Sequence, residues 1–204
     1  MTINLKRKKF YPVGRGLDEY LTSYHRSLEI PPLYEELHRF SQLYPLFDRE
    51  GNDTLWKTAF YDPAIRTELG AKLIQIYSLL KTNDFRSPEH LLLERVDFCD
   101  FGNSRPFRIR IVNQFNDNYD HFYVKIADAS RIYGLELEHI LSPNRINYLV
   151  KGNTLIEEHI AGVPGDTFIR EYFERPDTNP VRVAKEFVKF NERSFVRLLG
   201  DMRS

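Results

Sequence analysis

Apolar side chains recur every three or four residues in the first third of the chain, which is the spacing of one helix face. They are Leu33, Leu37, Phe40, Leu43 and Tyr44 in one segment, and Ile65, Leu69, Leu73, Ile76, Tyr77 and Leu80 in a second. Pro63 suits the first turn of the second helix, where its missing amide hydrogen has no cost. Residues 1–85 are therefore predicted to be helical, with breaks at the prolines and at the polar turn 49–53.

After Asn83 and Asp84 the pattern changes from helical to strand-like. Residues 92–98 are rich in apolar side chains, residues 107–112 alternate apolar and basic ones, and residues 122–126 follow a polar turn. Alternation at every second residue is typical of a half-exposed strand, and the polar turn predicts a hairpin. We therefore place a domain boundary near residue 85.

One helix, two strands and two further helices complete the pattern. Asp128 or Ser130 can cap a helix that runs to Leu141 and ends at Ser142 and Pro143. The later elements are strands at 146–150 and 154–160, a turn at 151–153, and helices at 166–173 and 181–199. The fold class predicted is α+β.

The composition narrows the possible ligands and the location. Lys plus Arg and Asp plus Glu number 29 each, so no net charge draws the chain to nucleic acid or to an anionic membrane. No apolar run approaches the roughly 18 residues that a membrane helix needs. The single cysteine, Cys99, fits a reducing compartment, so we expect a cytoplasmic protein. The six histidines lack the spacing of metal ligands.

From residue 92 onward the order of three strands, a helix, two strands, a bend and helices resembles the protein-kinase-like fold, in the branch that includes aminoglycoside phosphotransferases. The resemblance implies a helical N-terminal extension at 1–85 and a small lobe at 86–162, with an antiparallel five-stranded sheet and one helix. Residues 163–204 would then hold the helices that follow the hinge and the start of a catalytic loop. It also implies ATP and magnesium as cofactors.

Lys125, in the sequence Tyr-Val-Lys-Ile, sits like the kinase lysine that neutralises phosphate charge. The resemblance implies a carboxylate partner on the following helix. Glu136 is one turn from both Ile132 and Ile140, on a face expected to be buried, and is our choice. Glu138 is the alternative.

Three further positions follow from the same resemblance. Glu158 and Ile160 mark the exit of the strand that would form the hinge beside the adenine. Gly102 is the single glycine of the loop that would cover the phosphates. Asp201 follows Gly200 and resembles the aspartate that accepts the proton of the acceptor hydroxyl.

The function expected is that of a fragment or truncated form of a kinase-like phosphotransferase. It would bind ATP at the sheet and hinge, but it would not catalyse, because the asparagine and aspartate that hold magnesium would fall past Ser204. Its partners would be a nucleotide and either a protein or the missing C-terminal lobe. Two alternatives stay open: a non-enzymatic α+β protein-interaction module, and an RNA-binding sheet suggested by the alternating basic and aromatic residues at 107–111 and 122–126.

Overall fold

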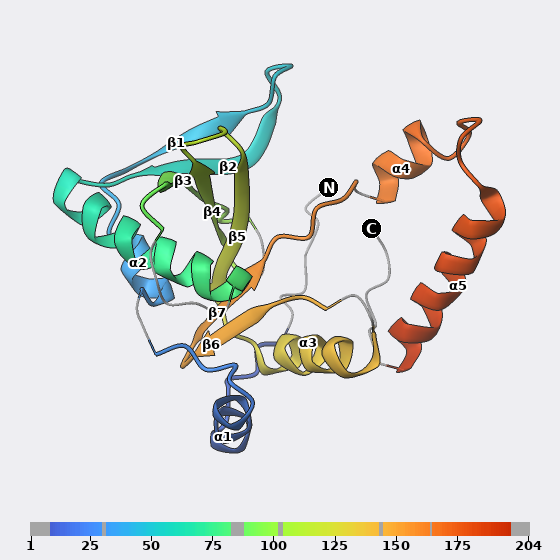
Figure 1. Ribbon diagram of the computed structural model, residues 1–204, viewed down its shortest axis with the longest axis horizontal. Coiled ribbons are helices and arrows are strands. Elements are labelled where there is room, and N and C mark those ends of the chain that lie inside the picture. The colour runs from blue at the N-terminus through green and yellow to red at the C-terminus, as the bar shows by residue number, and fades with distance from the viewer. Residues whose placement is uncertain are drawn as a thin grey trace, which may run out of the picture. The chain divides into compact units, whose positions relative to one another are not determined.

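The computed structural model describes residues 9–29, 32–82, 88–101, 104–142, 145–163 and 165–196 (Figure 1). It divides into two compact units, residues 1–159 and 160–204. The first unit is built on one antiparallel sheet of seven strands in the order β1-β2-β3-β4-β5-β7-β6. The strands are β1 (Gln42–Phe47), β2 (Asp53–Phe60), β3 (Leu91–Phe98), β4 (Phe107–Asn113), β5 (Tyr119–Ile126), β6 (Tyr148–Lys151) and β7 (Thr154–Glu158). The α+β class is therefore confirmed.

The prediction of a helical region at 1–85 and of five strands is wrong in part. Residues 34–38 form the 3-10 helix η1 (Tyr34–His38), and the chain then enters the hairpin of β1 and β2. Pro45 is incompatible with a helix interior but is tolerated on β1, which is an edge strand. The hairpin turn is closed by Asp48, whose carboxylate accepts the amide hydrogens of Glu50 and Asn52. The apolar residues between positions 33 and 44 thus lie in and around two short elements, η1 and β1, and not on one helix.

The predicted helix that begins at Pro63 is confirmed as α2 (Pro63–Thr82). Its buried residues Leu69, Leu73 and Ile76 pack against one face of the sheet (Figure 1). That face contributes Leu93, Val96, Phe98, Phe107, Ile109, Ile111, Phe122, Val124 and Ile156 to the same core. Burial of these side chains is the main stabilising contribution to the first unit, because apolar area is removed from water on both sides of the contact.

The predicted strands after residue 85 and the helix capped by Asp128 are also confirmed. α3 (Ala129–Leu141) begins where the Asp128 carboxylate accepts the amide hydrogen of Ser130. Ile132 and Leu135 of α3 pack with Leu155 of β7 and with Leu21 of α1 (Arg15–Ser23) in a second core cluster. Leu155 and Ile156 point to opposite faces of the strand, so α3 covers the face opposite to α2.

The second unit contains α4 (Gly165–Glu171) and α5 (Pro180–Val196), close to the two helices predicted there. Large apolar side chains on α5, among them Phe187, Phe190 and Phe195, are exposed. In the described part of the chain no helix is long and apolar enough to cross a membrane.

Candidate functional site

A single row of polar side chains crosses five strands of the sheet. Strand register pairs Thr58 with Asp97, Asp97 with Arg108, Arg108 with Tyr123 and Tyr123 with Glu157. The row beside it, Phe98, Phe107, Val124 and Ile156, is buried in the α2 core. Because successive side chains point to opposite faces, the polar row lies on the face away from α2. We call this the polar face. Arg95, Arg110, His121 and Lys125, two residues along their strands, share it, and the His159 ring, just past the end of β7, lies beside Tyr123 and His121.

At one end of the row two cations hold one buried carboxylate. Lys125 Nζ lies 2.7 Å from Glu157 Oε2, and Arg131 Nε lies 2.8 Å from Glu157 Oε1. The Glu157 side chain is 4% exposed, and that of Lys125 is 17% exposed. Burial alone would raise the pKa of Glu157, but the hydrogen bonds and charges of Arg131 and Lys125 hold it below its usual value. The carboxylate is therefore ionised, and the group carries a net charge of one positive unit.

A second group of the same kind lies on β3 and β4. Asp97, which is fully buried, accepts from Arg108 Nη2 at 2.8 Å, and Arg95 Nε lies 2.9 Å from its other oxygen. Thr58 on β2 donates its hydroxyl hydrogen to Asp97 at 3.0 Å. The Arg108 guanidinium also lies 4.5 Å from the centroid of the Trp56 ring. This group too has one cation more than it has anions.

Aromatic and histidine side chains fill the space around these groups. The Tyr123 ring lies 6.3 Å from that of Trp56, and its hydroxyl is 3.1 Å from His159 Nδ1. His121 has its pKa lowered to about 4 by burial and by the positive charges of Arg108, His159 and Arg110. Burial and these positive charges both disfavour an added proton at His121, and the positive charges alone favour an anionic ligand.

Lys125 lies on the polar face, but the expected ion pair with Glu136 is wrong. The Glu136 carboxylate accepts hydrogen bonds from Tyr20, Arg26 and Tyr148, on the side of α3 that faces α1 and β6. Arg131, five residues earlier, is the α3 residue that reaches Glu157. Five residues turn a helix by roughly 500°, which places the two side chains about 140° apart around the axis. Glu138, the alternative, lies two residues further along α3.

Of the other predicted positions, Glu158 and Ile160 are described by the structure, and neither is placed beside Lys125. Glu158 faces α2, where its carboxylate accepts from the Asn147 amide at 2.8 Å and lies 3.7 Å from Lys81. Ile160 is the first residue of the second unit and is 62% exposed. Gly102 and Asp201 lie outside the described residues.

The sequence contained a signal for Glu157 that the prediction did not use. Glu157 and Glu158 are consecutive on a strand, so one of them had to share the face of Lys125. The choice between them depends on the register of β5 with β7, where Lys125 lies opposite Leu155 and Tyr123 opposite Glu157. Arg131, Asp97 and Arg108 were missed because their contacts join different elements, α3 with β7 and β3 with β4.

The donor set suits phosphate and does not suit magnesium. Arginine and lysine side chains bind phosphate oxygens through charge-assisted hydrogen bonds. Both oxygens of Glu157 are already bound by cations, which leaves a metal ion no favourable approach. Among the described residues no group of three or more histidine, cysteine, aspartate or glutamate side chains is placed to hold a metal ion. We therefore derive no step through magnesium.

Comparisons with protein-family models, with curated proteins and with solved structures gave no match to this chain.

Proposed function

We propose that the chain binds ATP on the polar face, as the small lobe of a kinase-like phosphotransferase. Lys125 and Arg131 would hold the phosphates. The observation that carries the proposal is the anchored lysine, with Lys125 Nζ 2.7 Å from a buried carboxylate on a face where each buried carboxylate is held by two cations. A lysine held in one position is preorganised for phosphate, since little of its rotamer freedom is lost on binding.

The order of elements around Lys125 supports this proposal. β3, β4 and β5 precede α3, and β6 and β7 follow it, as the kinase-like resemblance implies. β7 then pairs with β5, so the strand that leads toward the expected hinge is the neighbour of Lys125. In one respect the structure differs from what the resemblance implies: the carboxylate that pairs with Lys125 is Glu157 on β7 and does not lie on α3.

Electrostatics would favour phosphate at this position over solvent. Glu157 neutralises only one of its two cations, and Arg131 is half exposed, with a side chain 48% accessible. A phosphate can therefore approach Arg131 and the remaining donor hydrogens of Lys125 while both side chains stay paired with Glu157. The free energy of binding is the energy gained from the phosphate contacts less the energy lost where they weaken the ion pairs with Glu157.

Single-stranded RNA is a second candidate, because the polar face also combines arginines with aromatic rings. Arg108 and Arg110 lie on the same face of β4, near Trp56 and Tyr119. These rings already carry a guanidinium, at 4.5 Å over Trp56 and 3.8 Å over Tyr119. A base would have to displace an arginine to stack, which makes ATP the better-supported ligand.

Isothermal titration of the protein with ATP, adenosine and a single-stranded RNA distinguishes the candidates. We expect ATP to bind at least tenfold more tightly than adenosine, because the phosphates supply the main contacts. Equal affinity for ATP and adenosine would contradict the proposal. Binding of RNA alone, with affinity that falls steeply as salt rises, would support the RNA-binding sheet. Binding of none of the three would leave the protein-interaction module as the function.

A further inference from the structure

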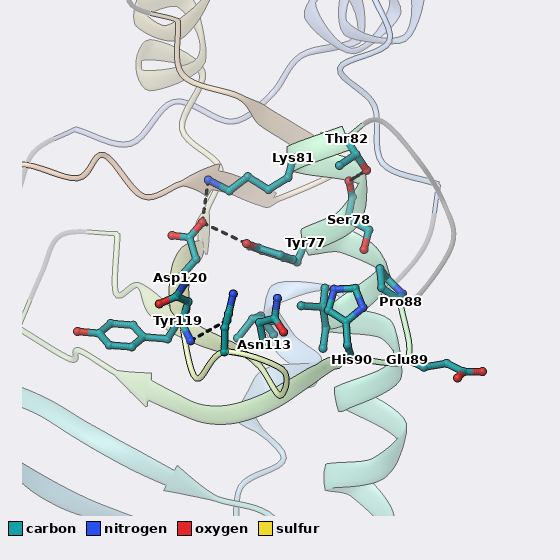
Figure 2. Close-up of a pocket in the computed structure, with 14 residues that line it drawn as sticks. Tyr77, Ser78, Lys81, Thr82, Pro88, Glu89, His90, Asn113, Tyr119 and Asp120 are labelled. Atoms are coloured by element: carbon teal, nitrogen blue, oxygen red, sulfur yellow. Dashed lines mark hydrogen bonds and ion pairs between the residues drawn. The ribbon is translucent and has the colours of Figure 1, made fainter.

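A hollow of about 810 Å³ lies on the side of the sheet opposite to the polar face (Figure 2). Three segments line it: the last turns of α2, residues 88–91 at the start of β3, and the turn that joins β4 to β5. Asp120 faces this hollow, whereas its neighbour His121 faces the other side of the sheet. The volume falls in the range of roughly 300–1,000 Å³ that is usual for small-molecule sites.

The hollow is held open by hydrogen bonds that do not depend on a ligand. The amide of Gln114 donates to the carbonyl oxygen of His90 at 2.8 Å, which ties the β4–β5 turn to the start of β3. The amide of Asn113 donates to the carbonyl oxygen of Asn118 at 2.8 Å and closes the turn itself. A preformed site of this kind loses little entropy when a ligand binds.

The charges that face the hollow cancel. Lys81 Nζ lies 2.8 Å from Asp120 Oδ2, and the Tyr77 hydroxyl donates to the same carboxylate at 3.3 Å. Burial would raise the pKa of Asp120, but its hydrogen bonds and the charge of Lys81 lower it overall. Burial and the neighbouring Asp120 raise the pKa of Tyr77 to about 12, so the phenol stays protonated. The Glu89 side chain points away from the hollow (Figure 2). An uncharged ligand is therefore favoured.

One buried hydroxyl in the wall has no hydrogen-bond partner among the described residues. Ser78 is 4% exposed, it lines the hollow, and its Oγ is unpaired. Figure 2 shows the side chain directed toward the strand start at Pro88 and His90. A buried hydroxyl without a partner has lost its hydrogen bonds to water and gained none in their place, which destabilises the fold. A ligand hydroxyl that bonded to Ser78 would recover this energy.

The remaining lining groups add amide donors over an apolar floor. The side-chain oxygens of Asn113 and Asn116 accept the amide hydrogens of Phe115 and Asn118 within the turn, so the NH2 group of each is the part left to donate to a ligand. Leu91 and Ile111 supply the apolar part of the lining. Neutral donors and acceptors above an apolar surface match a ring that has hydroxyl groups at its edge.

We propose that this hollow is a binding site for a small uncharged molecule that carries several hydroxyl groups on a ring, either a sugar or a nucleoside. Ser78 and the amide groups of Asn113 and Asn116 would bind the hydroxyls. The site is separate from the polar face, because Ser78 on α2 and Asp120 on β5 lie on the opposite side of the sheet, and it does not depend on the ATP proposal.

Saturation-transfer NMR on the whole chain, with D-glucose, myo-inositol and adenosine as probes, tests the proposal. We expect at least one probe to show transfer, with D-glucose or myo-inositol identifying a sugar-like ligand and adenosine a nucleoside. The signal should be lost in Ser78→Leu, which fills the hollow, and weakened several-fold in Ser78→Ala. Ser23→Leu, at an exposed position of α1, is the matched control and should keep the signal.

If Ser78→Leu does not fold, Ser78→Ala takes its place in the test. It removes only the hydroxyl, and alanine has a higher helix propensity than serine, so this variant should fold. Transfer that is the same in wild type and Ser78→Ala would contradict the role of Ser78 and overturn the proposal. Absence of transfer with all three probes would overturn it as well. A probe signal that is lost in Lys125→Ala but kept in Ser78→Ala would place the probe on the polar face, and that result would also count against the site.

Discussion

The side-chain nitrogen of Lys125 lies 2.7 Å from Oε2 of Glu157, a carboxylate that is almost fully buried. The two residues come from neighbouring strands, and Arg131 from α3 completes the group at 2.8 Å. A lysine is thereby fixed by the fold itself on the polar face, with its side chain 17% exposed. The structural role of this group and its proposed role in binding phosphate can be separated by mutation.

Replacing Glu157 by glutamine leaves Lys125 and Arg131 close together without their counter-charge. Removing one partner of a buried ion pair costs about 3–5 kcal/mol, and the glutamine oxygen recovers part of it, so we expect a loss of about 2–4 kcal/mol. Urea denaturation measures the change. Glu68→Gln, which breaks an exposed pair with Lys72, is the control and should cost far less than Glu157→Gln. Equal losses would mean that Glu157 is not the centre of a buried charge group.

Phosphate should rescue the same variant. The two unpaired cations of Glu157→Gln form a stronger anion site than in the wild type, so added inorganic phosphate should raise its midpoint of thermal unfolding more than that of the wild type. Sodium chloride at matched ionic strength controls for screening. An identical response of the two proteins to phosphate would contradict the assignment of Lys125 and Arg131 as phosphate ligands.

Glu136 should prove structural and unconnected with ATP. Its carboxylate accepts from Tyr20 and Arg26 in a part-buried network, so Glu136→Gln should lower the free energy of unfolding by about 1–3 kcal/mol. The affinity for ATP, measured by titration, should stay within twofold of the wild-type value. A tenfold loss of ATP affinity in a folded Glu136→Gln protein would restore the original assignment of Glu136 as the partner of Lys125.

The stability of the fold should depend on the protonation of His121. Its pKa is about 4 in the fold and about 6.5 in an unfolded chain, so between these values the unfolded state binds more protons. Stability should therefore fall as the pH drops from 6.5 to 4, by at most about 3 kcal/mol from this residue. Urea denaturation at several pH values should show that the free energy of unfolding changes less steeply with pH in His121→Asn than in the wild type. An unchanged slope would contradict the placement of His121 among cations.

Trp56 is the single tryptophan of the chain and reports on the polar face. Its ring lies beside Tyr123 and under the Arg108 guanidinium, so a ligand that moves either group should change its emission. ATP should alter the fluorescence, whereas a ligand of the hollow near Ser78 should not. A response to D-glucose with none to ATP would reverse the roles that we assign to the two sites.

Local periodicity predicted much of this fold. The long apolar stripe from Ile65 to Leu80 specified α2, and the alternation in residues 107–112 specified β4 and placed its arginines on one face. β1 and β2 were missed because aromatic residues at 40, 44 and 47 fit a helical spacing about as well as a strand spacing. The distinction depends on the pairing of residues 42–47 with residues 53–60, which is a tertiary contact.

The candidate site was predicted less completely than the fold. Strand alternation placed Lys125 and Tyr123 on one face, as the structure has them. The partner of Lys125 could not be derived, because it depends on the register of β5 with β7 and on the rotation of α3 about its axis. The resemblance led to Glu136 as the partner of Lys125, whereas in the structure Glu136 pairs with Arg26 and Lys125 pairs with Glu157.

The affinity of Lys125→Ala for ATP tests the central claim most directly. Isothermal titration should show at least tenfold weaker binding than in the wild type, because the variant loses a fixed cation that contacts the phosphates. Lys72→Ala, which removes an ion-paired lysine from the opposite side of the sheet, should bind ATP as the wild type does. Wild-type affinity in a folded Lys125→Ala protein would contradict the proposal that the polar face binds ATP.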